Sequence, residues 1–212
     1  MSPPIRDAAT VVLLREGADG PSVLMGQRGA GAAFMPSKYV FPGGAVDSGD
    51  AEVTFARPLE APVRAAMARQ SDTAPEALAG AALRELAEET GQVIAGPGPG
   101  CGWPGFEGRA PDAAPLRFVF RAITPPRRPR RFDARFFLVP ASALATDPDD
   151  FSAAEDELSH LHWVPLAEAR RLDMPFITEV VLAEVAAIVG GAEAQGVPFF
   201  DNSGETSTFR RL

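Results

Sequence analysis

The sequence predicts an α/β fold in which a mixed β-sheet is covered by helices. Segments rich in β-branched and other apolar residues, which are typical of strands, occur in both halves of the chain. Between and after them lie helical patterns, of which the longest, at residues 75–90, is rich in Ala, Leu and Glu. Because strands and helices do not alternate strictly, the sheet is expected to be mixed rather than wholly parallel.

The individual elements follow from local patterns and turn signals. Strands are expected at residues 8–15, 22–27, 133–139 and 158–165. Helices are expected at residues 63–70, 75–90 and 179–189. Gly91 is a suitable end for the long helix, since glycine commonly terminates helices. Residues 96–115 are dense in glycine and proline and are therefore predicted to form a loop.

Length and composition favour one domain, residues 1–212, with enough apolar residues (46%) to form a core. Cys101 is the single cysteine, which excludes an internal disulfide and a cysteine-based zinc site. No apolar run approaches a membrane span, and the first residues lack the hydrophobic region of a signal peptide. The net charge of −8 argues against a surface that coats nucleic acid. We therefore expect a cytoplasmic protein without nucleic-acid or membrane partners, whose oligomeric state is left open.

Three glutamates gather on one face of the long predicted helix. Glu85, Glu88 and Glu89 stand at positions i, i+3 and i+4, which places their Cβ atoms about 5–6 Å apart. Like charges this close repel one another, and a hard divalent cation such as Mg²⁺ or Mn²⁺ removes that cost. Taken alone, the segment is more typical of a solvated acidic helix surface.

A glycine turn upstream changes this interpretation. Pro42-Gly43-Gly44 allows the backbone to approach a ligand closely, because no Cβ obstructs it. Together with the glutamate segment it resembles the Nudix box, written G-x5-E-x7-R-E-U-x-E-E-x-G-U with U aliphatic. The matching positions are Gly44, Arg84, Glu85, Leu86, Glu88, Glu89 and Gly91.

The chain departs from this box in three ways. Asp50 replaces the first glutamate, and Gln92 stands where an aliphatic residue is usual. Arg84 follows Gly44 by 40 positions, about 26 more than the box has. The inserted stretch, around residues 51–76, is expected to be a surface excursion, which costs little additional loop-closure entropy.

The region from Val23 to Asp47, which includes Phe41-Pro42-Gly43-Gly44, is similar to the Nudix branch that contains the mammalian peroxisomal coenzyme A diphosphatase. That branch also splits its box with an insertion. The resemblance implies an α/β/α sandwich, with the box helix packed beneath the sheet. It also implies metal-dependent hydrolysis of a diphosphate linkage in a nucleoside diphosphate linked to another moiety. Coenzyme A or acyl-CoA is the leading substrate, giving 3′,5′-ADP and 4′-phosphopantetheine or its acyl form, ahead of ADP-ribose, NADH and nucleotide sugars.

Roles for the box residues follow from this chemistry. Glu85 and Glu89 are the first choice as ligands of Mg²⁺ or Mn²⁺, and Glu88 is a third ligand or the base that takes a proton from water. The resemblance adds the Gly43 carbonyl as a metal ligand. Arg84, although counted with the catalytic group, is expected to pair with a box carboxylate and fix its rotamer.

Outside the box, one acidic residue and several candidates for substrate binding are expected at the site. Glu157, in an acidic cluster, is a further candidate for base or metal ligand, with a solvated loop as the alternative. Local cations must bind the phosphates, and the candidates are Arg28, Lys38 and the arginine run at 127–131, represented by Arg131. Phe34 lies just before the glycine turn and is expected to line the pocket for the group beyond the diphosphate.

Two other classes of protein share some of these features. A non-catalytic Nudix-fold module that binds a nucleotide or a protein is expected to have lost box carboxylates, yet all three remain here. An acidic helical scaffold with a coincidental motif is expected to show no metal affinity. The acyl preference and the identity of the base are left open.

Overall fold

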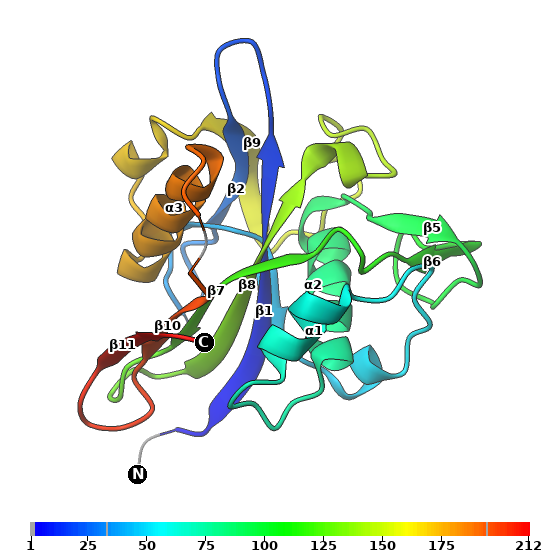
Figure 1. Ribbon diagram of the computed structural model, residues 1–212. Helices are drawn as coiled ribbons and strands as arrows, with labels where there is room; N and C mark the ends of the chain where they lie inside the picture. The colour runs from blue at the N-terminus through cyan, green and yellow to red at the C-terminus, as the bar shows by residue number, and fades with distance from the viewer. Residues whose placement is uncertain (1–2, 33, 194) are drawn as a thin grey trace.

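A mixed nine-stranded sheet forms the centre of the computed structural model, which describes residues 3–32, 34–193 and 195–212 (Figure 1). Its strand order is β11-β10-β7-β8-β1-β2-β3, with β4 paired to β1 and β9 paired to β2. The strands are β1 (Ile5–Arg15), β2 (Ser22–Arg28), β3 (Tyr39–Val40), β4 (Gly43–Ala45), β7 (Arg117–Ile123), β8 (Arg131–Pro140), β9 (Leu158–Pro165), β10 (Pro198–Asp201) and β11 (Thr208–Arg211).

Three helices and one small hairpin complete the described structure. The helices are α1 (Ala61–Met67), α2 (Pro75–Thr90) and α3 (Phe176–Val189), and the hairpin joins β5 (Ala95–Pro97) to β6 (Arg109–Pro111). Short 3₁₀ turns occur at η1 (Ser48–Ala51), η2 (Ala141–Ala143) and η3 (Ala169–Arg171). No helix in the described part of the chain is long and apolar enough to cross a bilayer.

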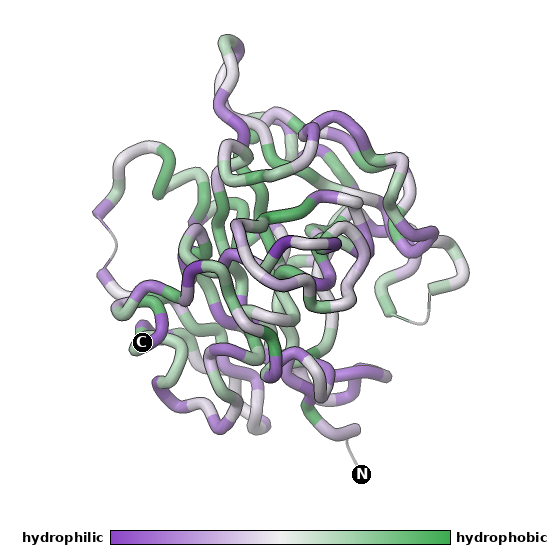
Figure 2. Tube along the Cα trace, turned by 90° about the vertical axis from the view of Figure 1, so that its right-hand side faces the viewer, coloured by the Kyte–Doolittle hydropathy of each residue, from purple (hydrophilic) through white to green (hydrophobic). Residues whose placement is uncertain are grey.

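The parallel pair β1 and β8 divides the core into two layers. Successive side chains of a strand point to opposite faces of the sheet. Val11 and Phe137, which are paired, pack in the cluster that contains α2, whereas Val12 and Leu138 pack in the cluster that contains α3. Helices α1 and α2 lie on one side of the sheet and α3 lies on the other (Figure 1). Hydrophobic residues concentrate along the inner segments, with hydrophilic residues in the outer loops (Figure 2). The expected α/β/α sandwich is confirmed.

Helix α2 has the bounds that the sequence predicts. Pro75 is its first residue, a position that tolerates proline because the missing N–H would have no helical partner. Gly91 ends it in the left-handed conformation (φ +70°) and donates its N–H to the Ala87 carbonyl. The middle of the helix packs very closely against η1, where Gly80 lies against the backbone carbonyl of Asp50. This contact sets the distance between the helix and the segment that follows the glycine turn.

The inserted stretch is more than the surface excursion expected from its polar and proline residues. Leu59 and Met67 are buried in the cluster beneath α2, and the short helix found here, α1, covers part of that cluster. Thr73 donates a hydrogen bond to Asp7 at 2.6 Å, which ties the end of the insertion to β1. Most of the stretch is exposed or half-buried, as expected, but two well-placed apolar side chains anchor it to the core.

Two further expectations are corrected by the structure. The predicted loop at residues 96–115 contains the β5–β6 hairpin and the fully buried Phe106, which packs on Val93. Strand β7 and the C-terminal strands β10 and β11 did not emerge from the sequence. Strand β7 is buried over nearly all of its length, so it shows no alternation of apolar and polar residues.

The Gly80 contact predicts the effect of a single added methyl group. We expect Gly80→Ala to destabilise the protein by about 2 kcal/mol, because a Cβ would meet the Asp50 backbone and overpacking outweighs the gain in helix propensity. Gly49→Ala is the matched control, since a Cβ there meets no atom of the described residues within 4 Å. Urea unfolding of both variants measures the difference, and equal stability would contradict the proposed close packing.

Candidate active site

The glycine turn and the second half of helix α2 meet although they are far apart in sequence. The Gly43 N–H donates to Glu89 Oε2 at 2.7 Å. A Cβ on Gly44 would collide with the carboxylate of Glu85. The turn therefore needs glycine at this position, because only a residue without a side chain allows the carboxylate to lie against the backbone. Pairing of β4 with β1 holds the turn in place, with Gly43 opposite Thr10 and Gly44 opposite Ala9.

Arg84 connects these carboxylates to one another. Its Nε and Nη2 donate to the two oxygens of Asp50 at 2.8 and 3.0 Å, and Nη2 also donates to the Ala45 carbonyl. Its Nη1 donates to Glu85 at 2.9 Å and to Glu88 at 2.8 Å. The planar guanidinium can make these contacts at once because its donors point outward in a fixed fork. The structure thus shows the expected pairing of Arg84 with box carboxylates.

Asp50, which replaces the first glutamate of the motif, is almost fully buried at 1% exposure. One of its oxygens also accepts the Asp47 N–H at 2.7 Å, so it closes the first turn of η1 while it holds Arg84. A buried carboxylate needs a cationic partner and several hydrogen bonds to offset its desolvation. Both are present, so the shorter side chain still reaches the arginine.

The environment of the glutamates makes their negative charge costly. Burial raises the pKa of Glu85 to about 7, although Arg84 opposes the shift, and burial raises the pKa of Glu89 well above its usual value despite the Gly43 hydrogen bond. The negative charge of Glu157 acts in the same direction on both residues. A cation placed among these carboxylates would remove both the desolvation cost and the mutual repulsion.

The donor set fits a hard divalent cation in chemistry, since carboxylate and carbonyl oxygens are the ligands that Mg²⁺ and Mn²⁺ prefer. The side chains of these glutamates do not surround a common point, as the ligands of a bound metal ion would. No group of three Asp, Glu, His or Cys side chains in residues 3–32, 34–193 and 195–212 is arranged to hold an ion. The reason is that Arg84 draws Glu85 and Glu88 toward itself while Gly43 holds Glu89. Asp50 would keep its two bonds to Arg84 if Glu85 and Glu88 turned away from it.

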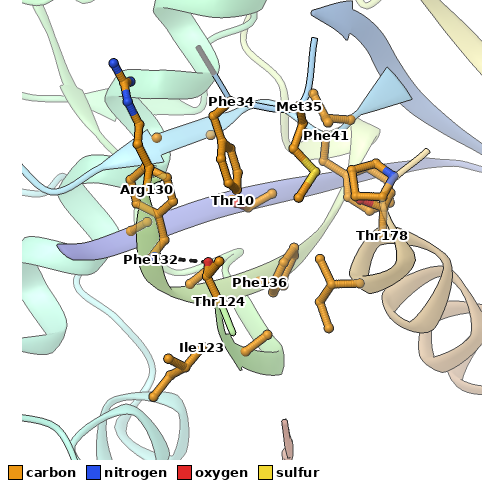
Figure 3. A pocket seen from close by; sticks show the side chains of 18 of the residues that line it. Thr10, Phe34, Met35, Phe41, Ile123, Thr124, Arg130, Phe132, Phe136 and Thr178 are labelled. Atoms are coloured by element: carbon orange, nitrogen blue, oxygen red, sulfur yellow. Dashed lines mark hydrogen bonds between the residues drawn. The ribbon is translucent and has the colours of Figure 1, made fainter. Parts of the chain in front are cut away.

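A cavity of about 410 Å³ opens beside the carboxylates and runs along β1 and β8 to the start of α3 (Figure 3). Residues from both halves of the motif line it, namely Gly43, Gly44 and Glu85. Arg28 and Glu157, both expected at the site, line it as well and form an ion pair of 2.7 Å. The Arg28 Nε is buried and has no hydrogen-bond partner among the described residues, so one donor of this side chain is unsatisfied.

Apolar and aromatic side chains form much of the cavity wall. Phe34, Met35 and Phe41 lie along one side of the cavity, and Phe132 and Phe136 lie along the other (Figure 3). The rings of Phe34 and Phe132 meet edge to face with centroids 5.4 Å apart. Phe34 therefore lies where the sequence places it, at the wall of the pocket.

Two of the basic residues expected at the site lie outside it. Lys38 is outside the cavity wall and bonds to Asp173 near the surface. Arg131 is buried on the other face of β8, where it donates to the carbonyls of Thr124 and Asn202. The alternation of side chains along β8 explains this outcome, because Phe132 faces the cavity and its neighbour must face away.

The sequence indicated the arginine run at 127–131 but chose Arg131 to represent it, whereas Arg128 and Arg130 of that run line the cavity. The alternation of side chains along β8 indicates which arginine faces the cavity. Phe132, Ala134 and Phe136 share one face, and extending that alternation backward by one step reaches Arg130. The sequence did not indicate Phe176, at the start of α3, which also lines the cavity.

Comparison with known proteins identifies the family. Residues 73–185 match the model of the NUDIX domain. The crystal structure of a NUDIX hydrolase from Alicyclobacillus acidocaldarius has 30% sequence identity and a TM-score of 0.65, and the alignment covers 91% of this chain and 94% of that one. A search of curated proteins gave no match.

Two more distant structures share the fold. One is an Ap4A hydrolase from C. elegans, with 16% identity, a TM-score of 0.54 and coverage of 88% of this chain and 99% of that one. The other is the NUDIX domain of Shewanella oneidensis NrtR in complex with ADP-ribose, with 14% identity, a TM-score of 0.54 and coverage of 88% and 90%. The family match agrees with the geometry of the site, since Glu85 of the box lines the pocket and Glu88 and Glu89 follow it on the same helix. The chain belongs to the NUDIX family and is a hydrolase of pyrophosphate bonds.

Proposed function

We propose that this hydrolase cleaves the diphosphate of coenzyme A or an acyl-CoA, giving 3′,5′-ADP and 4′-phosphopantetheine or its acyl form. The observation that carries the proposal is the composition of the pocket. Its carboxylate end suits a metal-bound diphosphate, and its long apolar wall suits a substrate with extended groups beyond the phosphates. The split box and the 23–47 segment support the same assignment. ADP-ribose, NADH and nucleotide sugars are the competing substrates, because the box chemistry alone does not distinguish the attached groups.

In this proposal, Glu85, Glu88 and Glu89, with the Gly43 carbonyl, hold Mg²⁺ or Mn²⁺. The ion, when bound, neutralises phosphate charge and lowers the pKa of a coordinated water. Arg84 does not touch the substrate. It orients Glu85 and Glu88 through Nη1, and its two bonds to Asp50 keep the guanidinium fixed while those glutamates turn.

Glu157 is the proposed base, and Arg28 is its partner. Glu157 is half exposed at the cavity wall, so it can accept a proton from water and release it to solvent. Arg28 fixes the position of that carboxylate through Nη2 and has Nε left to donate to a phosphate oxygen. Binding of a phosphate by Arg28 would weaken its hold on Glu157 and leave the carboxylate freer to accept the proton.

The remaining parts of the proposal concern the chain as a whole. Residues 1–212 act as a single catalytic domain in the cytoplasm, and the insertion supports the helix that carries the glutamates. The natural partner is a small nucleoside diphosphate derivative. Lys38 and Arg131 are not assigned to substrate binding, since their side chains are engaged away from the cavity.

Product identification tests the reaction and the metal role together. With Mg²⁺ and coenzyme A, we expect 3′,5′-ADP to form. Loss of a group that supports a metal ligand typically costs 10–100-fold, so we expect Glu89→Gln, which removes a ligand itself, to cost at least about 100-fold. Glu76→Gln is the matched control, because Glu76 lies at the other end of α2 and, within the described part of the chain, forms its ion pair with Arg64 at the surface.

The outcomes separate the alternatives. AMP from ADP-ribose or NADH, without 3′,5′-ADP from coenzyme A, would retain the diphosphatase and discard the substrate assignment. Full activity of Glu89→Gln on every substrate would remove the proposed metal role. No turnover of any substrate with Mg²⁺ or Mn²⁺ would favour a module that binds a nucleotide without cleaving it.

The raised pKa values of Glu85 and Glu89 predict how pH affects stability. The folded protein retains protons that the unfolded chain has already released, so these residues cost no stability below about pH 4.5 and destabilise increasingly as pH rises through about 7. Metal replaces those protons. We therefore expect the rise in Tm caused by Mg²⁺ or Mn²⁺ to be larger at about pH 8 than at about pH 5.

Thermal unfolding with and without metal at the two pH values measures this effect. The variant in which both Glu85 and Glu89 are replaced by Gln should lose the metal-induced rise and show a weaker decline of Tm with pH. A metal effect of equal size at both pH values would contradict the coupling.

A further inference from the structure

We propose that the pocket contains a second anion subsite, formed by Arg128 and Arg130, which binds a phosphomonoester on the substrate. This group would lie on the nucleoside side, away from the diphosphate that is cleaved. The inference rests on the proposed function in one respect, namely that the diphosphate binds at the Glu85 end of the cavity. It adds a selectivity that the box residues cannot provide.

The position of the two arginines separates them from the carboxylates. They lie in the connection between β7 and β8, at residues 124–130, and their side chains line the same cavity as Glu85. Ala9 pairs with Gly44 on one side and with Arg135 on the other, so the carboxylate end is level with Arg135 along β8. Arg130 precedes Arg135 by five residues, which corresponds to roughly 17 Å along the strand. A phosphate on the ribose lies closer to the 5′-diphosphate than this backbone separation, so the long side chains of the two arginines must extend back along the cavity to reach it.

An apolar section of the cavity lies between the two charged ends. Phe132, Ala134 and Phe136 alternate along the cavity face of β8, and Arg130 precedes them (Figure 3). Phe34 packs against Phe132 from the opposite wall. A ribose can bind against these rings, with its base to one side and its phosphate groups directed toward the two charged ends. The cavity therefore offers an apolar surface flanked by charged groups.

The charges around the cavity leave these two arginines without partners. The acidic side chains in its wall are Glu85, which bonds to Arg84, and Glu157, which bonds to Arg28. Among the residues that the structure describes, Arg128 and Arg130 form no ion pair and no side-chain hydrogen bond. Both arginines are exposed, and in a chain with a net charge of −8 they place two unpaired positive charges at the wall of one cavity.

Arginine chemistry indicates which group would bind there. A guanidinium presents paired donors that match the oxygens of a phosphate, and a phosphomonoester presents up to two negative charges. Adenosine 3′,5′-diphosphate carries such a group on its ribose. ADP-ribose, NADH and nucleotide sugars without a third phosphate lack it. The subsite would thus favour substrates with a phosphorylated ribose within the family of nucleoside diphosphate derivatives.

Binding is tested first, without any need for turnover. The probes are 3′,5′-ADP and 5′-AMP, which differ by the one phosphomonoester, and the measurement is the rise in Tm that each produces in the metal-free protein. We expect 3′,5′-ADP to bind about tenfold more tightly than 5′-AMP, as for a charged hydrogen-bonded contact. The difference should disappear in the Arg128→Gln, Arg130→Gln double variant. Arg127→Gln is the matched control, because it removes one charge from the same loop and Arg127 does not line the cavity.

Kinetics then connect the subsite to the reaction. We expect kcat/KM for coenzyme A to exceed that for 3′-dephospho-coenzyme A by about tenfold, and the double variant to lose this preference while it retains activity on the dephosphorylated substrate. NADPH and NADH provide the corresponding comparison for a phosphate on the 2′-oxygen, and a preference confined to that pair would place the phosphate there.

The two proposals fail in different ways. Equal binding of 3′,5′-ADP and 5′-AMP by the unmodified protein, or a preference that survives in the double variant, would overturn the subsite whether or not hydrolysis occurs. If no substrate is hydrolysed but the binding preference is present and depends on both arginines, the reaction is refuted and the subsite is supported. A loss of preference in Arg127→Gln equal to that in the double variant would show a general effect of loop charge and would also overturn it.

Discussion

The guanidinium of Arg84 is the contact on which the rest of the site depends. Two of its donors bind Asp50 and another binds both Glu85 and Glu88, so a single side chain links the segment after the glycine turn to the helix. Its position is itself determined by packing, since Gly80 of the same helix lies against the backbone of Asp50. The helix cannot shift along η1 without breaking the arginine fork. Fold stability and site geometry therefore share the same few contacts.

The network of charged side chains around Arg84 costs stability, and a role in binding a cation explains this cost. Buried carboxylates are expensive, and replacing a buried charge pair with apolar residues is often neutral or stabilising. Here the cost falls on Glu85 and Glu89, whose pKa values are raised because one arginine cannot compensate all the nearby carboxylates. A cluster of carboxylates with too few positive charges around it is suited to bind a cation. In the proposed site, the stability given up in the metal-free protein would become affinity for a bound cation.

The cavity has negatively charged groups at one end and positively charged groups at the other. Its carboxylate end, its aromatic middle and its arginine end come from segments that are remote in sequence, and parallel pairing of β1 with β8 aligns them. The same pairing explains why neighbouring arginines differ in role. Arg130 lines the cavity, whereas Arg131 binds carbonyl groups on the other face of the sheet. Strand alternation, rather than the local density of positive charge, decides which arginine is available to a ligand.

The sequence by itself determined helix α2 to the residue, the set of glutamates on its face and the glycine turn that they meet. Each of these follows from interactions within a few positions or from a motif with strong spacing. It also indicated Arg28, Glu157 and Phe34, which the structure brings to one cavity. Only the tertiary structure decided that Asp50 holds Arg84, that the insertion buries Leu59 and Met67, and that Arg128 and Arg130 replace Lys38 and Arg131 at the cavity wall. These outcomes depend on the register of non-local strand pairs and on which face each side chain takes, and a shift of one residue in that register would reverse them.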